Sequence, residues 1–315
     1  MKRRSQRGQL KRSLTQLRAA LSRAALVCCT GAGLLWELDQ SVAHTEASPR
    51  ATAQRVFISA QEAIRALRSG ARFLDARERP VSPLLGRIPG AMSAPWRTFS
   101  RGRRDGELLP AEALRERIRA LGLSGDERVV IYGDWDRGWG EEGRLFWMLD
   151  YLGHAQLRVL RGGWSAWRAA GGEVERGFQR ARAPGSWLPR PREERRQRLE
   201  AYDEEGARLQ RVDVRRRAEY QGATPYGSPC GGHIPHAINL HWRSLFDGPR
   251  LRDEEALRSI FEGAGLDLTA PIALYCTGGV RSAFVYLVLR DLGALEPRND
   301  DGSWWRWSRR RCEIE

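Results

Sequence analysis

The segment Pro271-Ile-Ala-Leu-Tyr-Cys276-Thr-Gly-Gly-Val-Arg281-Ser282 is the most informative part of this 315-residue sequence. Residues 271–275 are apolar and have the length of a strand, two glycines follow, and an apolar stretch of helical length begins near Ser282. A strand, a short glycine loop and a helix in this order are typical of a parallel sheet covered by helices. In such sheets, ligands bind beyond the carboxyl ends of the strands.

The same pattern occurs about 140 residues earlier, which indicates an internal duplication. Five blocks match in the same order: a strand ending in Asp-x-Arg, a Gly-x-Ile-Pro turn, a second strand, a helix ending in Leu-Gly, and a closing Gly-x-Trp-x-x-Trp. They lie at 72–77, 86–91, 128–132, 152–153 and 162–167 in the first copy, and at 209–215, 232–237, 271–275, 292–293 and 302–307 in the second. The sequence therefore predicts an α/β fold of two related domains, each a parallel sheet flanked by helices on both faces.

Composition divides the chain into four segments. We predict a basic N-terminal segment at 1–51, a first domain at 52–172, a linker at 173–206 and a second domain at 207–315. The linker is expected to be exposed, with one polar helix near 193–201, because it is rich in Arg, Glu and Pro.

The N-terminal segment has the features of a signal peptide or membrane anchor. Residues 1–23 are basic and contain no acid, and the apolar run at 24–36 is long enough for a signal-peptide core but short for a membrane span. Ser41-Val-Ala43 offers a cleavage site of small residues. We therefore expect an exported, periplasmic protein that contacts a membrane only through this segment. A cytoplasmic protein with a basic tail is the alternative.

The formal net charge of +14 does not point to nucleic acid. Lys2 and Lys11 are the only lysines, so arginine supplies 51 of the 53 basic residues. A nucleic-acid-binding protein usually gathers basic residues on one element, whereas here they are dispersed and mixed with acids. No nucleic-acid partner is predicted.

Cys276 is a candidate nucleophile because its neighbours favour the thiolate. Gly278 and Gly279 allow successive backbone N–H groups to point inward, which forms a cradle for an anion. The helix that starts near Ser282 and the guanidinium of Arg281 add positive charge. These features should lower the pKa of the thiol below its free value of about 8.5 and so produce the reactive form.

The other cysteines are expected to have no chemical role. The five cysteines form no CxxC pair, no metal-ligand pattern with His and no disulfide framework, so no metal site is predicted. Cys230 and Cys312 have no activating neighbours and are expected to be ordinary buried residues. The first domain contains no cysteine, and Gly133 stands at the position of Cys276. The first domain is therefore expected to have a structural or substrate-shaping role.

The repeated Asp-x-Arg, the Gly-His-Ile-Pro turn, the Cys276 loop and the closing Gly-Ser-Trp together resemble the rhodanese family of sulfurtransferases in its tandem form, over residues 52–315. The resemblance implies two rhodanese-like domains, of which only the C-terminal one is catalytic, and no cofactor. It implies that the Cys276 thiolate takes sulfur from thiosulfate or a related donor and passes it to cyanide or a thiol acceptor. The implied substrate-binding groups are Arg281, Thr277, Gly278, Gly279, Val280 and Ser282, with Asp213 and Arg215 supporting the loop.

Two departures from the family pattern bear on the donor. Vertebrate-type thiosulfate and mercaptopyruvate enzymes have an Arg where this chain has Glu219, and mercaptopyruvate enzymes have a loop resembling Cys-Gly-x-Gly-Val-Thr, where this chain has Thr277 and Arg281. A charged loop favours thiosulfate over a keto acid. The alternatives are a mercaptopyruvate sulfurtransferase, a persulfide carrier that needs a protein partner, and a cysteine-dependent phosphatase. Phosphatases place five residues between Cys and Arg, whereas four lie here.

Overall fold

The computed structural model describes residues 55–78 and 85–312. The predicted signal or anchor segment at 1–51 lies outside these residues. Within the described ranges, no helix is both long enough and apolar enough to cross a membrane.

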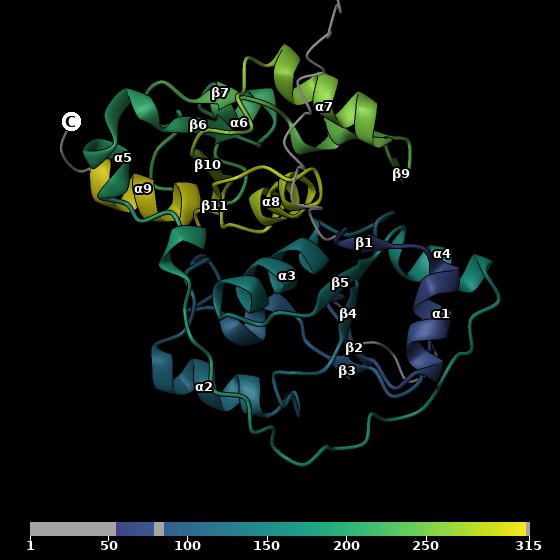
Figure 1. Cartoon of the computed structure of the whole chain (residues 1–315). Helices are drawn as coiled ribbons and strands as arrows, with labels where there is room; N and C mark the ends of the chain where they lie inside the picture. The colour runs from purple at the N-terminus through teal and green to yellow at the C-terminus, as the bar shows by residue number, and fades with distance from the viewer. Residues whose placement is uncertain (1–54, 79–84, 313–315) are drawn as a thin grey trace, which may run out of the picture. The chain divides into compact units, whose positions relative to one another are not determined.

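The first domain is built on a five-stranded sheet with the strand order β1-β5-β4-β2-β3, in which all neighbouring strands are parallel. Helices α1 and α4 cover one face of this sheet, and α2 and α3 cover the other (Figure 1). The elements are β1 (Phe57–Ile58), α1 (Ala60–Arg68), β2 (Arg72–Asp75), β3 (Met92–Ser93), α2 (Ala111–Arg119), β4 (Val129–Tyr132), α3 (Glu141–Tyr151), β5 (Leu157–Leu160) and α4 (Gly163–Ala169). A 3₁₀ turn spans Trp96–Phe99.

The second domain has a four-stranded parallel sheet with the order β11-β10-β6-β7 and a small antiparallel hairpin formed by β8 and β9. Side chains of α7 and α8 pack on one face of the sheet, and side chains of α5 and α9 pack on the other. The elements are α5 (Ala201–Glu204), β6 (Gln210–Asp213), α6 (Arg217–Tyr220), β7 (Ile238–Asn239), β8 (Phe246–Asp247), β9 (Arg250–Leu251), α7 (Glu254–Gly263), β10 (Ile272–Tyr275), α8 (Arg281–Asp291), β11 (Pro297–Asn299) and α9 (Ser303–Arg311). Further 3₁₀ turns lie at Gly206–Arg208 and Trp242–Leu245. The predicted fold class of two α/β domains is confirmed.

The repeated Asp-x-Arg motif makes the same contacts in both domains. In the second domain, Arg215 donates to the carboxylate of Asp213 and, through Nη2, to the carbonyl oxygen of Gly232 at 2.7 Å. In the first domain, Arg77 binds Asp75 in the same way and reaches the first glycine of its own Gly-x-Ile-Pro block at 3.1 Å. The motif thus ties the end of one strand to the turn that leads into the next.

Helices α3 and α8 form the principal contact between the two domains. The two helices approach closely at Gly143, where a Cβ atom would lie 2.4 Å from the Cα of Phe284. All of α3 and nearly all of α8 are buried, which explains why neither sequence shows one apolar and one polar face.

The linker between the domains is less exposed than expected. Glu175 pairs with Arg87 of the first domain through backbone and side-chain bonds, and Trp187 is buried with its ring 5.0 Å from that of His154. The linker contains a 3₁₀ turn at Glu193–Arg195, and α5 follows it. Part of the linker therefore packs on the first domain instead of being wholly exposed.

Cys230 and Cys312 form a disulfide, so the prediction that they are ordinary buried residues is wrong. Their Cα atoms lie 6.2 Å apart although 82 positions separate them in the sequence. The bond ties the segment before the Gly-His-Ile-Pro turn to the end of α9. A pairing across this distance has no local spacing pattern, so the sequence offered no signal for it.

Candidate active site

Cys276 lies at the carboxyl end of β10, where the chain turns into α8, and is almost completely buried. The N–H of Gly279 donates to the sulfur atom at 3.2 Å. The N–H of Cys276 itself donates to the hydroxyl of Ser303 at 3.1 Å. The thiol is therefore held in a loop whose amide groups turn towards it, as the sequence predicted.

Glycine is required at two positions of the loop. A Cβ atom on Gly278 would lie 2.2 Å from the ring of Trp305, so no side chain fits there. Gly279 has a φ of +76° and lies against Arg144, whose Nη1 would be 2.6 Å from an added Cβ. Positive φ and close approach both favour glycine.

The surroundings of Cys276 favour its ionised form. Burial by itself raises the pKa of the thiol, but the charge of Arg281 and hydrogen bonds from the N–H groups of Ser282 and Gly278 outweigh it. The net pKa of Cys276 is lower than the ordinary value. A thiolate in such a site is nucleophilic.

Arg281 forms a buried ion pair with Glu219. Its Nη1 and Nη2 donate to the two carboxylate oxygens, each at 2.8 Å. The hydroxyl of Thr277 donates to Glu219 at 2.9 Å and accepts from Arg281 at 2.6 Å. Burial raises the pKa of Glu219, but its bonds to Arg281 lower it more, so the carboxylate is ionised at neutral pH.

Aromatic rings hold the guanidinium of Arg281 in place. Its central carbon lies 5.5 Å from the ring centre of Trp139, which belongs to the first domain, and 5.5 Å from that of Tyr226. In the sequence, Glu219 stands out only as the loss of an expected arginine. The pairing with Arg281 was missed because 62 positions separate the two residues.

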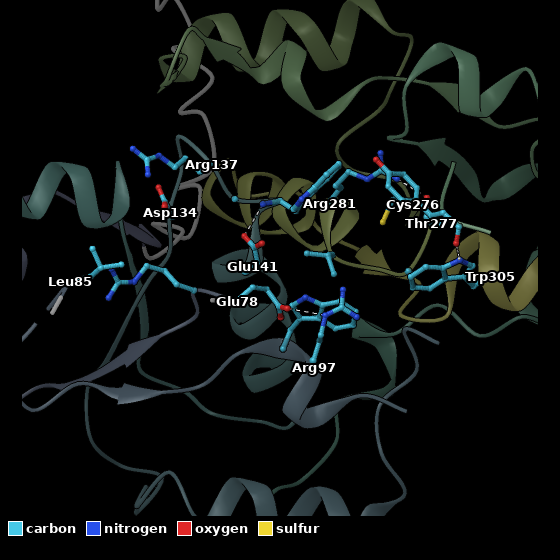
Figure 2. A pocket seen from close by; sticks show the side chains of 17 residues that line it. Glu78, Leu85, Arg97, Asp134, Arg137, Glu141, Cys276, Thr277, Arg281 and Trp305 are labelled. Atoms are coloured by element: carbon cyan, nitrogen blue, oxygen red, sulfur yellow. Dashed lines mark hydrogen bonds and ion pairs between the residues drawn. The ribbon is translucent and has the colours of Figure 1, made fainter. Parts of the chain in front are cut away.

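The thiol faces a cavity of about 460 Å³ that both domains line. Figure 2 shows Cys276 and Arg281 on one side of this cavity, with Glu78 and Arg97 on the other. The second domain contributes Tyr226, Cys276, Thr277, Gly278, Val280, Arg281 and Trp305, and the first contributes Arg77, Glu78, Leu85, Trp96, Arg97, Asp134, Arg137, Gly138, Trp139 and Glu141.

A model of the rhodanese-like domain matches residues 59–170 and again residues 196–310. The chain belongs to the rhodanese family. The two matches together cover more than half of its length, as the resemblance in the sequence predicted.

Among known relatives, a thiosulfate sulfurtransferase from Pseudomonas aeruginosa is 32% identical over 234 residues, which are 70% of this chain and 82% of the relative. A protein named sulfur carrier protein TtuD from Thermus thermophilus is 29% identical over 242 residues, again 70% of this chain and 82% of the relative. Among solved structures, the 3-mercaptopyruvate sulfotransferase SseA from Escherichia coli is 25% identical, covers 80% of this chain and 99% of its own, and has a TM-score of 0.69. This chain is a sulfurtransferase of the rhodanese family, and its relatives differ in the sulfur donor that their names state.

The remaining predicted site residues of this rhodanese lie around the loop without lining the cavity. Gly279 and Ser282 contact the thiol from within the loop. Asp213 and Arg215 are buried and bind each other and Gly232, and the strand that ends in Asp213 pairs with β10, which precedes Cys276. Their role as loop supports stays a prediction.

The end of β11 contributes residues that sequence analysis missed. Asn299 donates through Nδ2 to the carbonyl oxygen of Gly279 at 3.2 Å. Ser303, which accepts from the N–H of Cys276, is held by the carboxylate of Asp300 at 2.6 Å. The available signal was the closing Gly-Ser-Trp block, because β11 is parallel to β10 and the two strands end at the same edge.

In the first rhodanese domain, a carboxyl group occupies the place of the thiol. A Cβ atom on Gly133 would lie 1.9 Å from Oε2 of Glu142, which is the counterpart of Ser282 at the start of α3. Burial raises the pKa of Glu142 to about 8. The space that would accommodate a cysteine side chain is therefore filled.

Proposed function

We propose that this rhodanese transfers the outer sulfur of thiosulfate, through a persulfide on Cys276, to cyanide or a thiol. The Cys276 thiolate attacks the outer sulfur, the sulfur–sulfur bond of the donor breaks, and sulfite leaves with the electron pair of that bond. Cyanide or an acceptor thiolate then attacks the outer sulfur of the persulfide, and the Cys276 thiolate is released. No proton or electron is consumed in the exchange with anionic acceptors.

The observation that carries this proposal is the thiol of lowered pKa within a loop of amide groups that faces a cavity. Thiosulfate, sulfite and the persulfide are all anions, so one fixed set of N–H dipoles stabilises every species along the path. Such prearranged groups are usually the largest contribution to catalysis of this kind.

Thiosulfate is proposed as the donor because arginines surround the cavity. Arg77, Arg97 and Arg137 of the first domain line it together with Arg281. Guanidinium groups match the geometry of sulfonate oxygens. Glu219 offsets the charge of Arg281, as Asp75 offsets that of Arg77 and Glu78 that of Arg97. Arg137 forms no ion pair within the described residues, so it becomes the more important attraction for the donor.

The test is mass spectrometry of the full chain after exposure to thiosulfate, compared with exposure to mercaptopyruvate. We expect one added sulfur on the peptide that contains Cys276, its loss on addition of cyanide, and no addition in Cys276→Ala. Labelling by mercaptopyruvate but not thiosulfate would support the alternative donor. No sulfur on Cys276 with either compound would refute sulfur transfer.

A sulfur carrier that delivers to a protein is the second candidate. It is favoured by the size of the cavity, since about 460 Å³ far exceeds what cyanide fills, and by the similarity to a protein named as a sulfur carrier. Rapid turnover with thiosulfate and cyanide alone would exclude the need for a protein partner.

We also propose export to an oxidising compartment. The predicted signal or anchor at 1–51 and the Cys230–Cys312 disulfide both support this location, because disulfides persist outside the reducing cytosol. The same mass measurement on protein from its native host reads the mature N-terminus. An intact Met1 on soluble protein from the cytoplasm would contradict the proposal.

A further inference from the structure

The two central helices differ at one pair of equivalent positions. Helices α3 and α8 have the same length and start 140 residues apart, so Arg144 of α3 is the counterpart of Phe284 of α8. Each of these side chains is directed at the loop of the other domain. Phe284 packs edge-on against Trp135 in the loop of the first domain, with ring centres 5.6 Å apart. Arg144 instead binds Gly279 in the loop that contains the thiol.

Arg144 is held by contacts from both domains. Its Nη1 donates to the carbonyl oxygen of Gly279 at 3.3 Å. Its Nη2 donates to Gly106 O and, at 3.4 Å, to the hydroxyl of Ser100. The guanidinium also lies 4.7 Å from the ring centre of Trp147. Only 1% of this arginine is exposed, so the position of its charge is well defined.

The charge of Arg144 is buried without a direct acidic partner. Within residues 55–78 and 85–312, no carboxylate forms an ion pair with it, and the neighbouring Asp301 pairs with Arg196 at 2.8 Å. A buried cation of this kind is costly unless negative charge lies nearby. Burial lowers the pKa of Arg144 to about 10, and the negative charges of Asp301 and of an ionised Cys276 oppose that shift.

The hydrogen bond to Gly279 also has a geometric effect. The carbonyl oxygen of Gly279 accepts from Arg144 on one domain and from Asn299 on the other. Because a peptide group is planar and trans, fixing this carbonyl fixes the direction of the N–H of Val280. The N–H of Gly279, one peptide earlier, is the group that donates to the sulfur.

We propose that Arg144 is a positioning residue through which the first domain keeps Cys276 ionised. It anchors the loop at Gly279 and places a permanent positive charge behind the sulfur, where thiolate and persulfide both carry negative charge. The proposal rests on the proposed function only in taking Cys276 as the reactive group. It gives the first domain a role in the chemistry, which a domain without a thiol would otherwise lack.

Other charged groups also act on this thiol, and the experiment has to separate them. Arg281, with its partner Glu219, lies on the α8 side of the loop. Asp301 and Arg196 lie near Arg144 and remain unchanged in the variants described below. Of the charged groups near the thiol, only Arg144 therefore differs between the wild-type protein and the variants at position 144.

The test is the pH dependence of alkylation by iodoacetamide, followed on the Cys276 peptide in the full chain. In Arg144→Met we expect the pKa of Cys276 to rise by about one pH unit, since a buried charge one residue away from the hydrogen bond to the sulfur acts with on the order of 1 kcal/mol in protein. Arg144→Lys retains the charge and should restore most of the shift. The matched control is Arg87→Met, which removes a buried arginine of the first domain that binds Glu175 and not the loop.

A folded Arg144→Met with an unchanged pKa of Cys276 would overturn the proposal, as would an equal rise in Arg144→Lys or in the control. Should Arg144→Met not fold, Arg144→Gln keeps a donor for Gly279 without the charge and takes its place. The readout needs no sulfur donor. A failure of thiosulfate to label the wild-type protein would therefore refute the proposed function and leave this result standing.

Discussion

Glu219→Gln tests how far the buried ion pair limits the use of an anionic donor. The substitution removes the negative charge that faces Arg281 and keeps nearly the same shape. Removing one partner of a buried ion pair typically costs about 3–5 kcal/mol of stability. Because the Gln oxygen still accepts from Arg281 or Thr277, we expect a loss of roughly 2–3 kcal/mol in the free energy of unfolding.

The effect on substrate binding should have the opposite sign. In the wild-type protein, the carboxylate of Glu219 lies 2.8 Å from both terminal nitrogens of Arg281 and offsets its charge. Once released, this charge would attract a bound sulfonate with about 2 kcal/mol, which is roughly half the interaction of two unit charges 4 Å apart at an effective dielectric constant near 20. This corresponds to a fall in KM for thiosulfate of up to roughly 30-fold.

The assay is thiosulfate:cyanide transfer at low and high ionic strength, together with urea unfolding of the same samples. The fall in KM should shrink as salt screens the charge. Glu175→Gln is the matched control, because it removes the acid from another arginine pair, with Arg87, outside the cavity. A folded Glu219→Gln with an unchanged or higher KM at low salt would refute the reasoning, and Arg281 would then have no part in attracting the donor.

Three further predictions concern the second domain. In the double variant Cys230→Ser/Cys312→Ser, the free energy of unfolding should be about 4 kcal/mol lower, because the disulfide closes a loop of 82 residues. Urea unfolding with and without reductant measures this difference. Gly278→Ala should reduce sulfur transfer more than tenfold, because the new methyl group would lie 2.2 Å from the ring of Trp305. Because the pKa of Cys276 is lowered, its alkylation rate should level off at a lower pH than that of an ordinary thiol, and it should fall as the pH drops through that pKa.

Each of these predictions has an outcome that contradicts it. An unfolding curve of the serine double variant that matches the wild type would show that the disulfide adds no stability. For the glycine, Gly263→Ala is the control, since nothing lies within 4 Å of a Cβ placed there, and equal activities of the two variants would reject the steric argument. A Cys276 alkylation rate that keeps rising through alkaline pH would reject the ionised thiol.

The arrangement of the Cys276 loop could be predicted because its residues are adjacent in the chain. A strand, two glycines and a helix start have one common arrangement, and the structure places the amide of Gly279 on the sulfur of Cys276 accordingly. The duplication could also be predicted, since the matched blocks repeat in the same order. Local spacing and repetition were sufficient for the fold class and for the arrangement of the loop around Cys276, whereas the role of Cys276 as nucleophile stays a prediction.

The electrostatic partners could not be predicted, because they come from distant parts of the chain. Glu219 is 62 positions from Arg281, and Arg144 is 135 positions from Gly279. No spacing rule connects such residues, and only the folded sheets bring them together. The assignment of Arg281 to donor binding stays a prediction, now with a buried carboxylate beside it that the sequence did not reveal as its partner.

The loop at Gly133 in the first domain differs from the loop at Cys276 in the second, and this difference bears on why the first domain retains Arg144. Glu142 fills the place of a thiol at Gly133. A cysteine introduced at that position would therefore have no space unless the carboxyl group of Glu142 were also removed. The same helix, two residues later, directs Arg144 at the opposite loop. A domain that had lost its thiol and contributed only packing would have no need of a buried cation at that point, where a side chain like Phe284 would suffice. The negative charges of Asp301 and of an ionised Cys276 both offset the cost of burying that charge, and the second of them would make Cys276 and the retained first domain parts of one site.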